Sequence, residues 1–190
     1  FVTKPISDKS LIATVFARAQ RARLLSNALS RDSLTGLLKH ADIKERVAVE
    51  QERAMRTGKP VSVVMLDIDH FKKVNDSYGH GIGDNVIRAL ANLLRQRLRR
   101  VDVIGRYGGE EFLAVLHECS GAQAVQILDQ IRQQFSQISF SSEMGDFNAS
   151  LSAGIASCVE LEASALIDAA DKALYAAKNT GRNRVCLAEI

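Results

Sequence analysis

The pattern of apolar and polar positions divides the chain into blocks that predict alternating strands and helices. Residues 61–66, Val-Ser-Val-Val-Met-Leu, are nearly all apolar and rich in β-branched side chains, which is typical of a central strand covered on both faces. A polar helix is expected after a turn at residues 32–37, and Gly58-Lys59-Pro60 ends it. Residues 84–98 then place apolar side chains on one helical face, and a β-hairpin about Gly108-Gly109 follows.

Further elements follow the hairpin. Helices are expected near residues 123–135 and 164–178, on either side of a strand at 147–156, and residues 184–187 can add a last strand. The resulting βαββαβ order predicts an α/β (α+β) domain with a mixed, mostly antiparallel central sheet flanked by helices. We assign residues 31–190 to this domain.

Residues 1–30 differ from this domain and are expected to end an upstream domain and form a stalk helix. Pro5 forces its predecessor Lys4 into an extended conformation, and a helix can follow. Apolar and small residues three and four apart then form a heptad seam, which predicts either pairing with a second copy of the chain or packing on a neighbouring domain. The seam residues are Ile12, Val15, Ala19, Ala22, Ser26 and Leu29.

Composition narrows the class of function. The 190 residues are 46% hydrophobic, enough for one buried core. Lys+Arg 25 against Asp+Glu 22 gives 25 − 22 = +3, which is mild compared with a DNA-binding stripe, so a small anionic ligand is expected and no nucleic-acid polymer. Cys119, Cys158 and Cys186 lack metal or redox spacing, which predicts reduced thiols in the cytoplasm. No apolar run approaches the ~20 residues of a membrane span, and the start lacks a signal-peptide pattern.

Three acidic residues lie where a predicted strand or hairpin ends. Asp67 follows the buried strand, and Glu110 and Glu111 lie at the hairpin tip, so the two places can be neighbours in one sheet. Converging carboxylates suit Mg²⁺, which takes oxygen ligands and substrate phosphates in phosphoryl and nucleotidyl transfer. Each acid taken alone is more simply a solvated loop residue. Gly108-Gly109 favours a ligand site, because a glycine turn lets the backbone approach a large ligand.

The sequence around these acids resembles the signature of the GGDEF family of diguanylate cyclases, in its form with two glutamates. The resemblance covers about residues 31–188 and implies a palm-like cyclase fold that joins two GTP molecules into cyclic di-GMP. The matching segments, in the order and spacing of the family, are Leu34-Thr35-Gly36-Leu37, Asp67-Ile68-Asp69-His70-Phe71-Lys72, Asn75-Asp76-Ser77-Tyr78-Gly79-His80, Gly83-Asp84, Arg106-Tyr107-Gly108-Gly109-Glu110-Glu111-Phe112 and Lys178-Asn179-Thr180-Gly181-Arg182.

The resemblance implies a metal site at the acids. Asp67, the backbone carbonyl of Ile68 and Glu110 would hold Mg²⁺, for which Mn²⁺ is a possible substitute. Glu111 would share this site or help to deprotonate the attacking hydroxyl. Glu110 and Glu111 are therefore the candidate catalytic residues, and the sequence does not divide the roles between them.

Asn75 and Asp84 match the guanine-reading positions of the family. The chemistry agrees, because a carboxylate accepts from the N1 and N2 hydrogens of guanine and an amide can bond the other edge. Asp84 also fits a helix N-cap, and Asn75 also fits a turn. Both interpretations stay open for each residue.

Other substrate contacts follow from the resemblance. Lys72 would counter phosphate charge, and Lys178 and Arg182 match phosphate-contacting positions. Without the resemblance, Lys178 before Gly181 is an ordinary basic helix end. The remaining implied contacts are Phe71, His80 and the glycines that permit close approach, namely Gly79, Gly81, Gly83, Gly108 and Gly109.

Arg99 and Asp102 have the family's spacing for an inhibitory site that binds cyclic di-GMP. The planar guanidinium suits this role, since it can pair with phosphate or a guanine edge while stacking on a base. From composition alone, the pair is a solvated basic helix end. A third arginine that often completes the site aligns with Gln130, so tight feedback would need Arg132 or a second subunit.

Two features of the sequence extend or depart from the family pattern. Residues 38–40, Leu-Lys-His, replace the usual Pro-Asn-Arg, which alters local packing or a substrate contact but spares the metal ligands. The segment Lys4-Pro5 followed by a helix resembles the end of a receiver domain, which would place the cyclase in a response regulator.

The implied reaction is a two-metal displacement in which the 3′ hydroxyl of one GTP attacks the α-phosphorus of another, twice per product. Each domain would hold one GTP, so catalysis would need a homodimer. Two other functions fit part of the sequence: a sensor that binds cyclic di-GMP or GTP without turnover, and another nucleotide cyclase or polymerase-like enzyme. The complete set of acids argues against the sensor, and the guanine-reading pair argues against the other enzymes.

Overall fold

The computed structural model describes residues 12–18 and 30–190. The chain divides into two compact units, residues 1–31 and 32–190. In the first unit, residues 12–18 are helical, and Ile12, Val15 and Phe16 are exposed. The other seam residues, from Ala19 to Leu29, and the Lys4-Pro5 segment lie outside the described residues. Pairing through the seam and the receiver resemblance therefore stay predictions, as does the assignment of residues 1–30 to an upstream domain.

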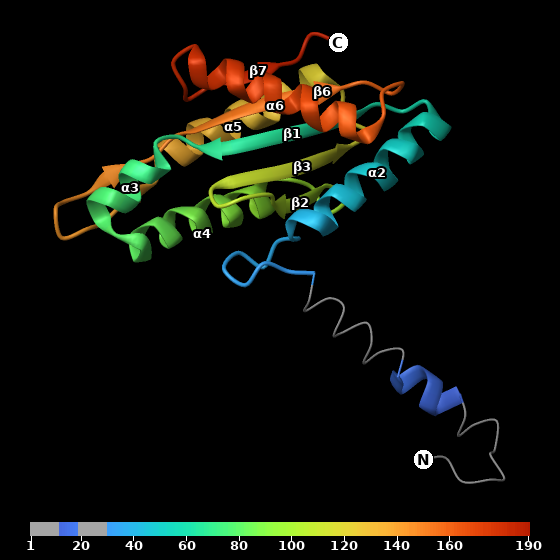
Figure 1. The fold of residues 1–190 in the computed structure, drawn as a ribbon, viewed down its shortest axis with the longest axis horizontal. Coiled ribbons are helices and arrows are strands. Elements are labelled where there is room, and N and C mark those ends of the chain that lie inside the picture. The colour runs from blue at the N-terminus through green and yellow to red at the C-terminus, as the bar shows by residue number, and fades with distance from the viewer. Residues whose placement is uncertain (1–11, 19–29) are drawn as a thin grey trace. The chain divides into compact units, whose positions relative to one another are not determined.

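A five-stranded sheet forms the centre of the second unit (Figure 1). Its strands are β1 (Val61–Ile68), β2 (Val103–Arg106), β3 (Glu111–His117), β6 (Leu151–Ser157) and β7 (Val185–Leu187). The spatial order is β2-β3-β1-β6-β7, in which only the β6–β7 pair is parallel. The predicted mixed, mostly antiparallel sheet is confirmed. A separate two-stranded sheet consists of β4 (Ser139–Phe140) and β5 (Phe147–Asn148).

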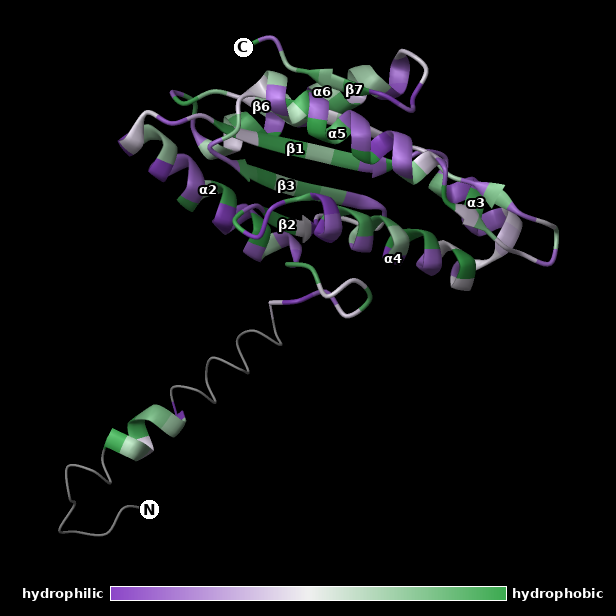
Figure 2. Ribbon diagram, turned by 180° about the vertical axis from the view of Figure 1, so that it is seen from behind, coloured by the Kyte–Doolittle hydropathy of each residue, from purple (hydrophilic) through white to green (hydrophobic). Residues whose placement is uncertain are grey.

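Helices α2 (His40–Thr57), α4 (His80–Arg97), α5 (Gly121–Ser136) and α6 (Ala163–Asn179) cover the two faces of the large sheet. The short helix α3 (Phe71–Tyr78) lies beyond the end of β1 and packs against α4 (Figure 1). Side chains alternate across β1: Val64 and Leu66 belong to a core with α4 and α5, whereas Val63 and Met65 belong to a second core with α2 and α6. Figure 2 shows the apolar colouring of β1 and β3 between helices of mixed polarity. None of the helices in the described part of the chain is long and apolar enough to span a membrane.

Several predicted elements are found where the sequence placed them. Every residue of β1 is buried, as expected of a central strand. Helix α2 ends at Thr57, and Gly58 follows in the left-handed conformation with φ 68°, which closes the last turn. The hairpin of β2 and β3 also forms around Gly108-Gly109.

Three details of the prediction were wrong. Helix α4 begins at His80, so Asp84 lies inside the helix and is no N-cap. Asn75 lies in α3 and not in a turn; this helix has only eight residues, of which Phe71 and Val74 are buried, and so leaves little periodic signal. The strand expected at 147–156 is split into β5 and β6, because residues 147–148 pair with β4 in the small sheet.

Candidate functional site

The three predicted acids meet at one end of the central sheet. Asp67, near the end of β1, lies opposite Glu111, the first residue of β3, in the antiparallel register. The backbone N–H of Ile68 also donates to the carbonyl of Glu110 at 3.4 Å. The apolar sequence of β1 buries the strand up to Ile68, so Asp67, the one acidic residue of this strand, is held at the edge of the core. The sheet register thus produces the convergence that the sequence suggested.

Asp67 is paired with a cation from α6. It is only 6% exposed, and its Oδ2 lies 2.8 Å from Nζ of Lys178, in the last turn of that helix. Burial raises the pKa of Asp67 to about 6; the Lys178 ammonium opposes this rise, and the carboxylates of Glu110 and Glu111 add to it. Added positive charge at this place would stabilise the ionised form of Asp67.

The glycine turn of the hairpin is fixed by Arg106. Its Nε and Nη2 donate to the carbonyl of Gly109 at 3.0 and 2.7 Å, and its Nη1 pairs with Asp32 at 3.2 Å. A Cβ at Gly108 would lie 2.5 Å from Oε2 of Glu111, so a side chain at this position would displace the carboxylate from its present place. The Arg106–Asp32 contact was missed from the sequence, since the two residues are 74 positions apart.

The hairpin tip has a further contact at the segment that departs from the family pattern. The ring of His40 stacks on Tyr107 with the centroids 4.1 Å apart, and its Nδ1 lies 2.8 Å from the Tyr107 carbonyl oxygen. Leu38 pairs with Gly105 at the edge of the sheet. The altered residues 38–40 therefore support the hairpin that carries the acids.

The corner between α3 and α4 brings Asn75 next to the glycine that precedes Asp84. A Cβ at Gly83 would overlap Oδ1 of Asn75 and lie 3.2 Å from Cζ of Phe71. A side chain at residue 83 would therefore displace the Asn75 amide from its present position. Asn75 and Asp84 are both partly exposed, so an amide and a carboxylate are accessible at the same corner.

The other predicted substrate residues are accessible as well. Lys72 and His80 are exposed, whereas Phe71 is largely buried. Arg182 is exposed in the turn after α6, where its φ is 60° and its N–H donates to the Ala177 carbonyl at 3.0 Å. Among Lys72, Lys178 and Arg182, it is Lys178 that contacts an acid of the site directly, namely Asp67.

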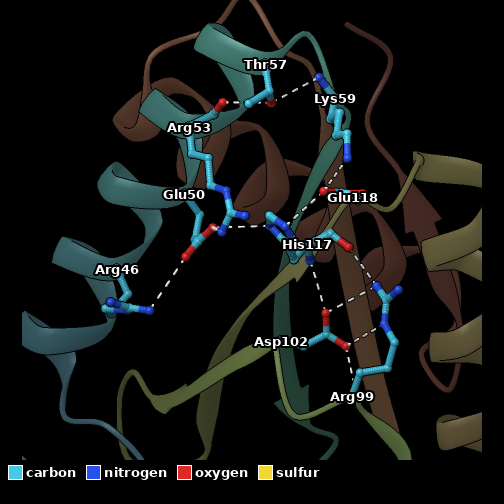
Figure 3. A network of polar contacts seen from close by, with 9 residues as sticks. All are labelled: Arg46, Glu50, Arg53, Thr57, Lys59, Arg99, Asp102, His117 and Glu118. Atoms are coloured by element: carbon cyan, nitrogen blue, oxygen red, sulfur yellow. Dashed lines mark hydrogen bonds and ion pairs between the residues drawn. The ribbon is translucent and has the colours of Figure 1, made fainter.

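Arg99 and Asp102 are joined to each other and to the end of β3 (Figure 3). The Asp102 side chain is 2% exposed and accepts from the N–H groups of Arg99 and His117 at 2.8 and 3.1 Å. Nη2 of Arg99 donates to the carbonyl of His117 at 2.7 Å, while its side chain stays 54% exposed. Asp102 is thus a buried structural acid that orients an accessible guanidinium, and not part of a solvated helix end.

The arginine considered for completing this inhibitory site is engaged elsewhere. Arg132 binds Asp129 at 2.7 Å and Asn183 Oδ1 at 2.9 Å, next to the turn after α6. Gln130 is exposed. Figure 3 shows another connection that the sequence did not reveal: Nδ1 of His117 lies 3.2 Å from Oε2 of Glu50, which links the end of β3 to α2.

Comparison with known proteins adds to this geometry. The sequence model of a family described as "Diguanylate cyclase, GGDEF domain" matches residues 29–184. Diguanylate cyclase DgcP of Pseudomonas aeruginosa is 41% identical over 155 residues, which cover 81% of this chain and 23% of the relative. Response regulator PleD of Caulobacter vibrioides is 36% identical over 198 residues, which cover 97% and 44%. The chain thus spans less than half the length of these two relatives.

The fold has close counterparts among solved structures. The crystal structure of the coiled coil and GGDEF domain of DgcB from Caulobacter crescentus, in complex with c-di-GMP, matches with a TM-score of 0.84 at 28% identity. The match covers 95% of this chain and 98% of that one. The mixed sheet with helices on both faces is therefore the architecture of a known group of domains.

Proposed function

Because the chain belongs to the GGDEF family of diguanylate cyclase domains, we propose that it joins two GTP molecules into cyclic di-GMP and releases two pyrophosphates. The observation that carries this proposal is the convergence of Asp67 with Glu110 and Glu111 at one end of the sheet, beside Lys178. Acids and a cation at one place suit the binding and transfer of a phosphorylated nucleotide.

The acids fit Mg²⁺ as an incomplete site that the substrate would complete. Among residues 12–18 and 30–190, no three His, Cys, Asp or Glu side chains form a ready-made metal cluster. Mg²⁺ is usually held by one or two carboxylates plus substrate phosphates, so Asp67, the Ile68 carbonyl, Glu110 and Glu111 are a sufficient donor set. Mn²⁺ is expected to substitute. When bound, two such ions would neutralise the charge that develops on the transferred phosphoryl group.

The remaining groups of the site are proposed to bind GTP. Asn75 and Asp84 would read the guanine edges, which their joint exposure at the α3–α4 corner permits. Lys178 and Arg182, on α6 and the turn after it, would bind the phosphates together with Lys72. Phe71, His80, Gly108 and Gly109 would line the nucleotide.

The reaction forms a bond between the 3′ oxygen of one GTP and the α-phosphorus of another, and breaks the bond from that phosphorus to pyrophosphate. Glu111 is proposed to help take the proton of the 3′ hydroxyl. Each domain would supply one GTP, so two copies must meet, and the exposed Ile12, Val15 and Phe16 on the first helical segment offer apolar surface for pairing. DgcB, whose structure contains a coiled coil next to its GGDEF domain, supports such an arrangement.

Feedback by the product is proposed at Arg99 and Asp102. The exposed Arg99 guanidinium is held by a buried carboxylate, which orients it for phosphate or a guanine edge. The DgcB structure was determined in complex with c-di-GMP, and this chain shares its fold.

A cytoplasmic location is also proposed, because Cys119, Cys158 and Cys186 are all free thiols. Neither a nucleic-acid polymer nor a membrane is needed as a partner for this reaction.

Substrate choice tests the proposal. The purified chain is incubated with Mg²⁺ and either GTP or ATP, and the products are separated by chromatography. We expect cyclic di-GMP from GTP and no cyclic dinucleotide from ATP. In Asp84→Asn the guanine reader is weakened, and the preference for GTP should fall about tenfold or more, whereas Asp76→Asn on the exposed side of α3 should keep it. Binding of GTP without any product, at high protein concentration, would favour a sensor.

A further inference from the structure

Asp69 is a second buried acid next to the proposed metal site, and no step of the proposed reaction uses it. It follows directly after β1, which ends at Ile68, and it is 4% exposed. An ionised carboxylate only accepts hydrogen bonds, and burying one is unfavourable unless donors surround it. Its partners therefore indicate what this residue does.

The carboxylate of Asp69 joins three segments of the chain. Oδ1 accepts from the hydroxyl of Ser152 at 2.7 Å. Oδ2 accepts from the hydroxyl of Ser150 at 2.7 Å and from the backbone N–H of Asn183 at 3.0 Å. The N–H of Asp69 also donates to the Ser150 carbonyl at 2.9 Å. The end of β1, the beginning of β6 and the turn after α6 are thus held by one side chain.

The turn after α6 needs this support because its backbone is unfavourable. Gly181, Arg182 and Asn183 have φ values of 118°, 60° and 46° in succession. Two of the three are not glycine, and side chains disfavour the left-handed region. Such a conformation persists where surrounding contacts determine it. The hydrogen bond from the Asn183 N–H to Asp69 provides one such contact in the middle of the turn.

The same turn carries a proposed phosphate-binding residue. Arg182 immediately precedes Asn183, and Lys178 lies in the last turn of α6 just before it. Two acids of one short segment hold this region: Asp67 contacts the side chain of Lys178, and Asp69 contacts the backbone of Asn183. The cations are thereby fixed with respect to the strand that carries the metal ligands.

We propose that Asp69 is a positioning residue for the triphosphate of the substrate, which it serves by tethering the turn that carries Arg182. This inference rests on the proposed function, since it takes GTP as the substrate. The role belongs to the hydrogen bonds of Asp69 and not to its charge, because the contact with the turn is made to a backbone N–H.

Two substitutions at Asp69 separate the tether from the charge. Asp69→Ala removes all three acceptor contacts, whereas Asp69→Asn keeps an oxygen for the Asn183 N–H and can donate its amide hydrogens to Ser152 Oγ. Asp146→Ala, at an exposed position between β4 and β5, is the matched control. Affinities for 3′-deoxy-GTP and 3′-deoxy-GMP are measured by calorimetry with Mg²⁺, since neither ligand has the hydroxyl that reacts.

We expect Asp69→Ala to bind 3′-deoxy-GTP about tenfold more weakly and to bind 3′-deoxy-GMP within about twofold of the parent. Asp69→Asn should recover most of the affinity, and Asp146→Ala should change neither value. If Asp69→Ala does not fold, the double variant Ser150→Ala/Ser152→Ala is measured instead, in which the Asp69 carboxylate keeps the Asn183 N–H as its one donor among those described above. A smaller loss, of about threefold, is then expected for the triphosphate.

The inference would be overturned by an alanine variant that loses affinity for both ligands equally, by an alanine variant that loses affinity for neither, or by an asparagine variant as impaired as the alanine variant. A parent protein that binds 3′-deoxy-GTP no better than 3′-deoxy-GMP would overturn it too. The cyclase reaction is judged separately from product formation with GTP. If the parent makes no cyclic di-GMP but Asp69→Ala still loses affinity for 3′-deoxy-GTP alone, the proposed reaction is contradicted and the role of Asp69 is supported.

Discussion

Lys178 of α6 and Asp67 of β1 form an ion pair, with Nζ 2.8 Å from Oδ2, although the two residues are far apart in the sequence. The contact brings the last turn of a helix to the end of the central strand. Because the nearby Glu110 and Glu111 add negative charge, the ammonium partly neutralises the site. We expect Lys178 to exchange this carboxylate for a phosphate oxygen when Mg²⁺ and GTP bind.

Lys178→Ala is expected to raise the KM for GTP about tenfold or more, because a charge-assisted hydrogen bond to a phosphate is lost. The value of kcat should change less if Lys178 mainly binds the substrate. Steady-state pyrophosphate release measures both constants. Lys172→Ala, an exposed lysine on the same helix, should leave both unchanged. Equal effects of the two variants would contradict the role given to Lys178.

Asp32 should make the stability of the domain depend on acid pH. Burial acts to raise the pKa of Asp32, but hydrogen bonds from Thr35 and the Arg106 guanidinium outweigh it and hold the pKa below its usual value. A carboxyl whose pKa is lower in the folded state stabilises that state above the unfolded pKa, and the contribution is lost as the pH falls through the folded pKa.

Asp32→Asn is therefore expected to lower the free energy of unfolding by about 1–2 kcal/mol at neutral pH. Its difference from the parent should shrink in acid, because the unfolded chain takes up the proton first, below about pH 4, and the folded Asp32 follows only at lower pH. Urea unfolding at both pH values measures this difference, with the exposed Asp146→Asn as the control. A difference that stays constant or grows in acid would show that the charge of Asp32 is not what stabilises the turn.

The two residues of the proposed feedback site should respond differently to substitution. Arg99→Ala removes a guanidinium that is 54% exposed, so inhibition by cyclic di-GMP should weaken at least about tenfold with little change in thermal stability. Asp102→Ala removes a carboxylate that is 2% exposed and bonded to two backbone N–H groups, so it should also destabilise the domain by about 1–3 kcal/mol.

Inhibition curves of initial rate against added cyclic di-GMP, together with thermal unfolding, test this pair. Arg100→Ala, the exposed neighbour, serves as the control. Unchanged inhibition in Arg99→Ala would place any product site elsewhere on the molecule.

The sheet and its acids were predictable because the signals are local. The apolar run at 61–66 identifies the central strand, and an acid after it must lie at the sheet end. The position of Glu110 and Glu111 follows from the hairpin, because they lie at its tip and its second strand, β3, pairs with β1. The start of α4 was misplaced because Gly79, Gly81 and Gly83 resemble a loop, although α4 begins at His80 and Gly83 packs against the side chain of Asn75.

The contacts that hold the site in place could not be predicted in the same way. Arg106 with Asp32, His117 with Glu50, and Asp69 with Asn183 each join residues that are distant in the sequence. No spacing or periodicity relates such residues, because the fold alone brings them together. The sequence therefore identifies the residues of the candidate site better than it identifies their supports.

The central claim is that the acids at the ends of β1 and β3 catalyse cyclic di-GMP formation, and product stoichiometry tests it most directly. The parent, Glu111→Ala and the exposed control Glu143→Ala are incubated with GTP and Mg²⁺, and cyclic di-GMP and pyrophosphate are quantified together. We predict two pyrophosphates per cyclic di-GMP in the parent and the control, and a loss of at least about 100-fold in rate for Glu111→Ala. Full activity in Glu111→Ala, or GTP consumption without cyclic di-GMP, would contradict the account.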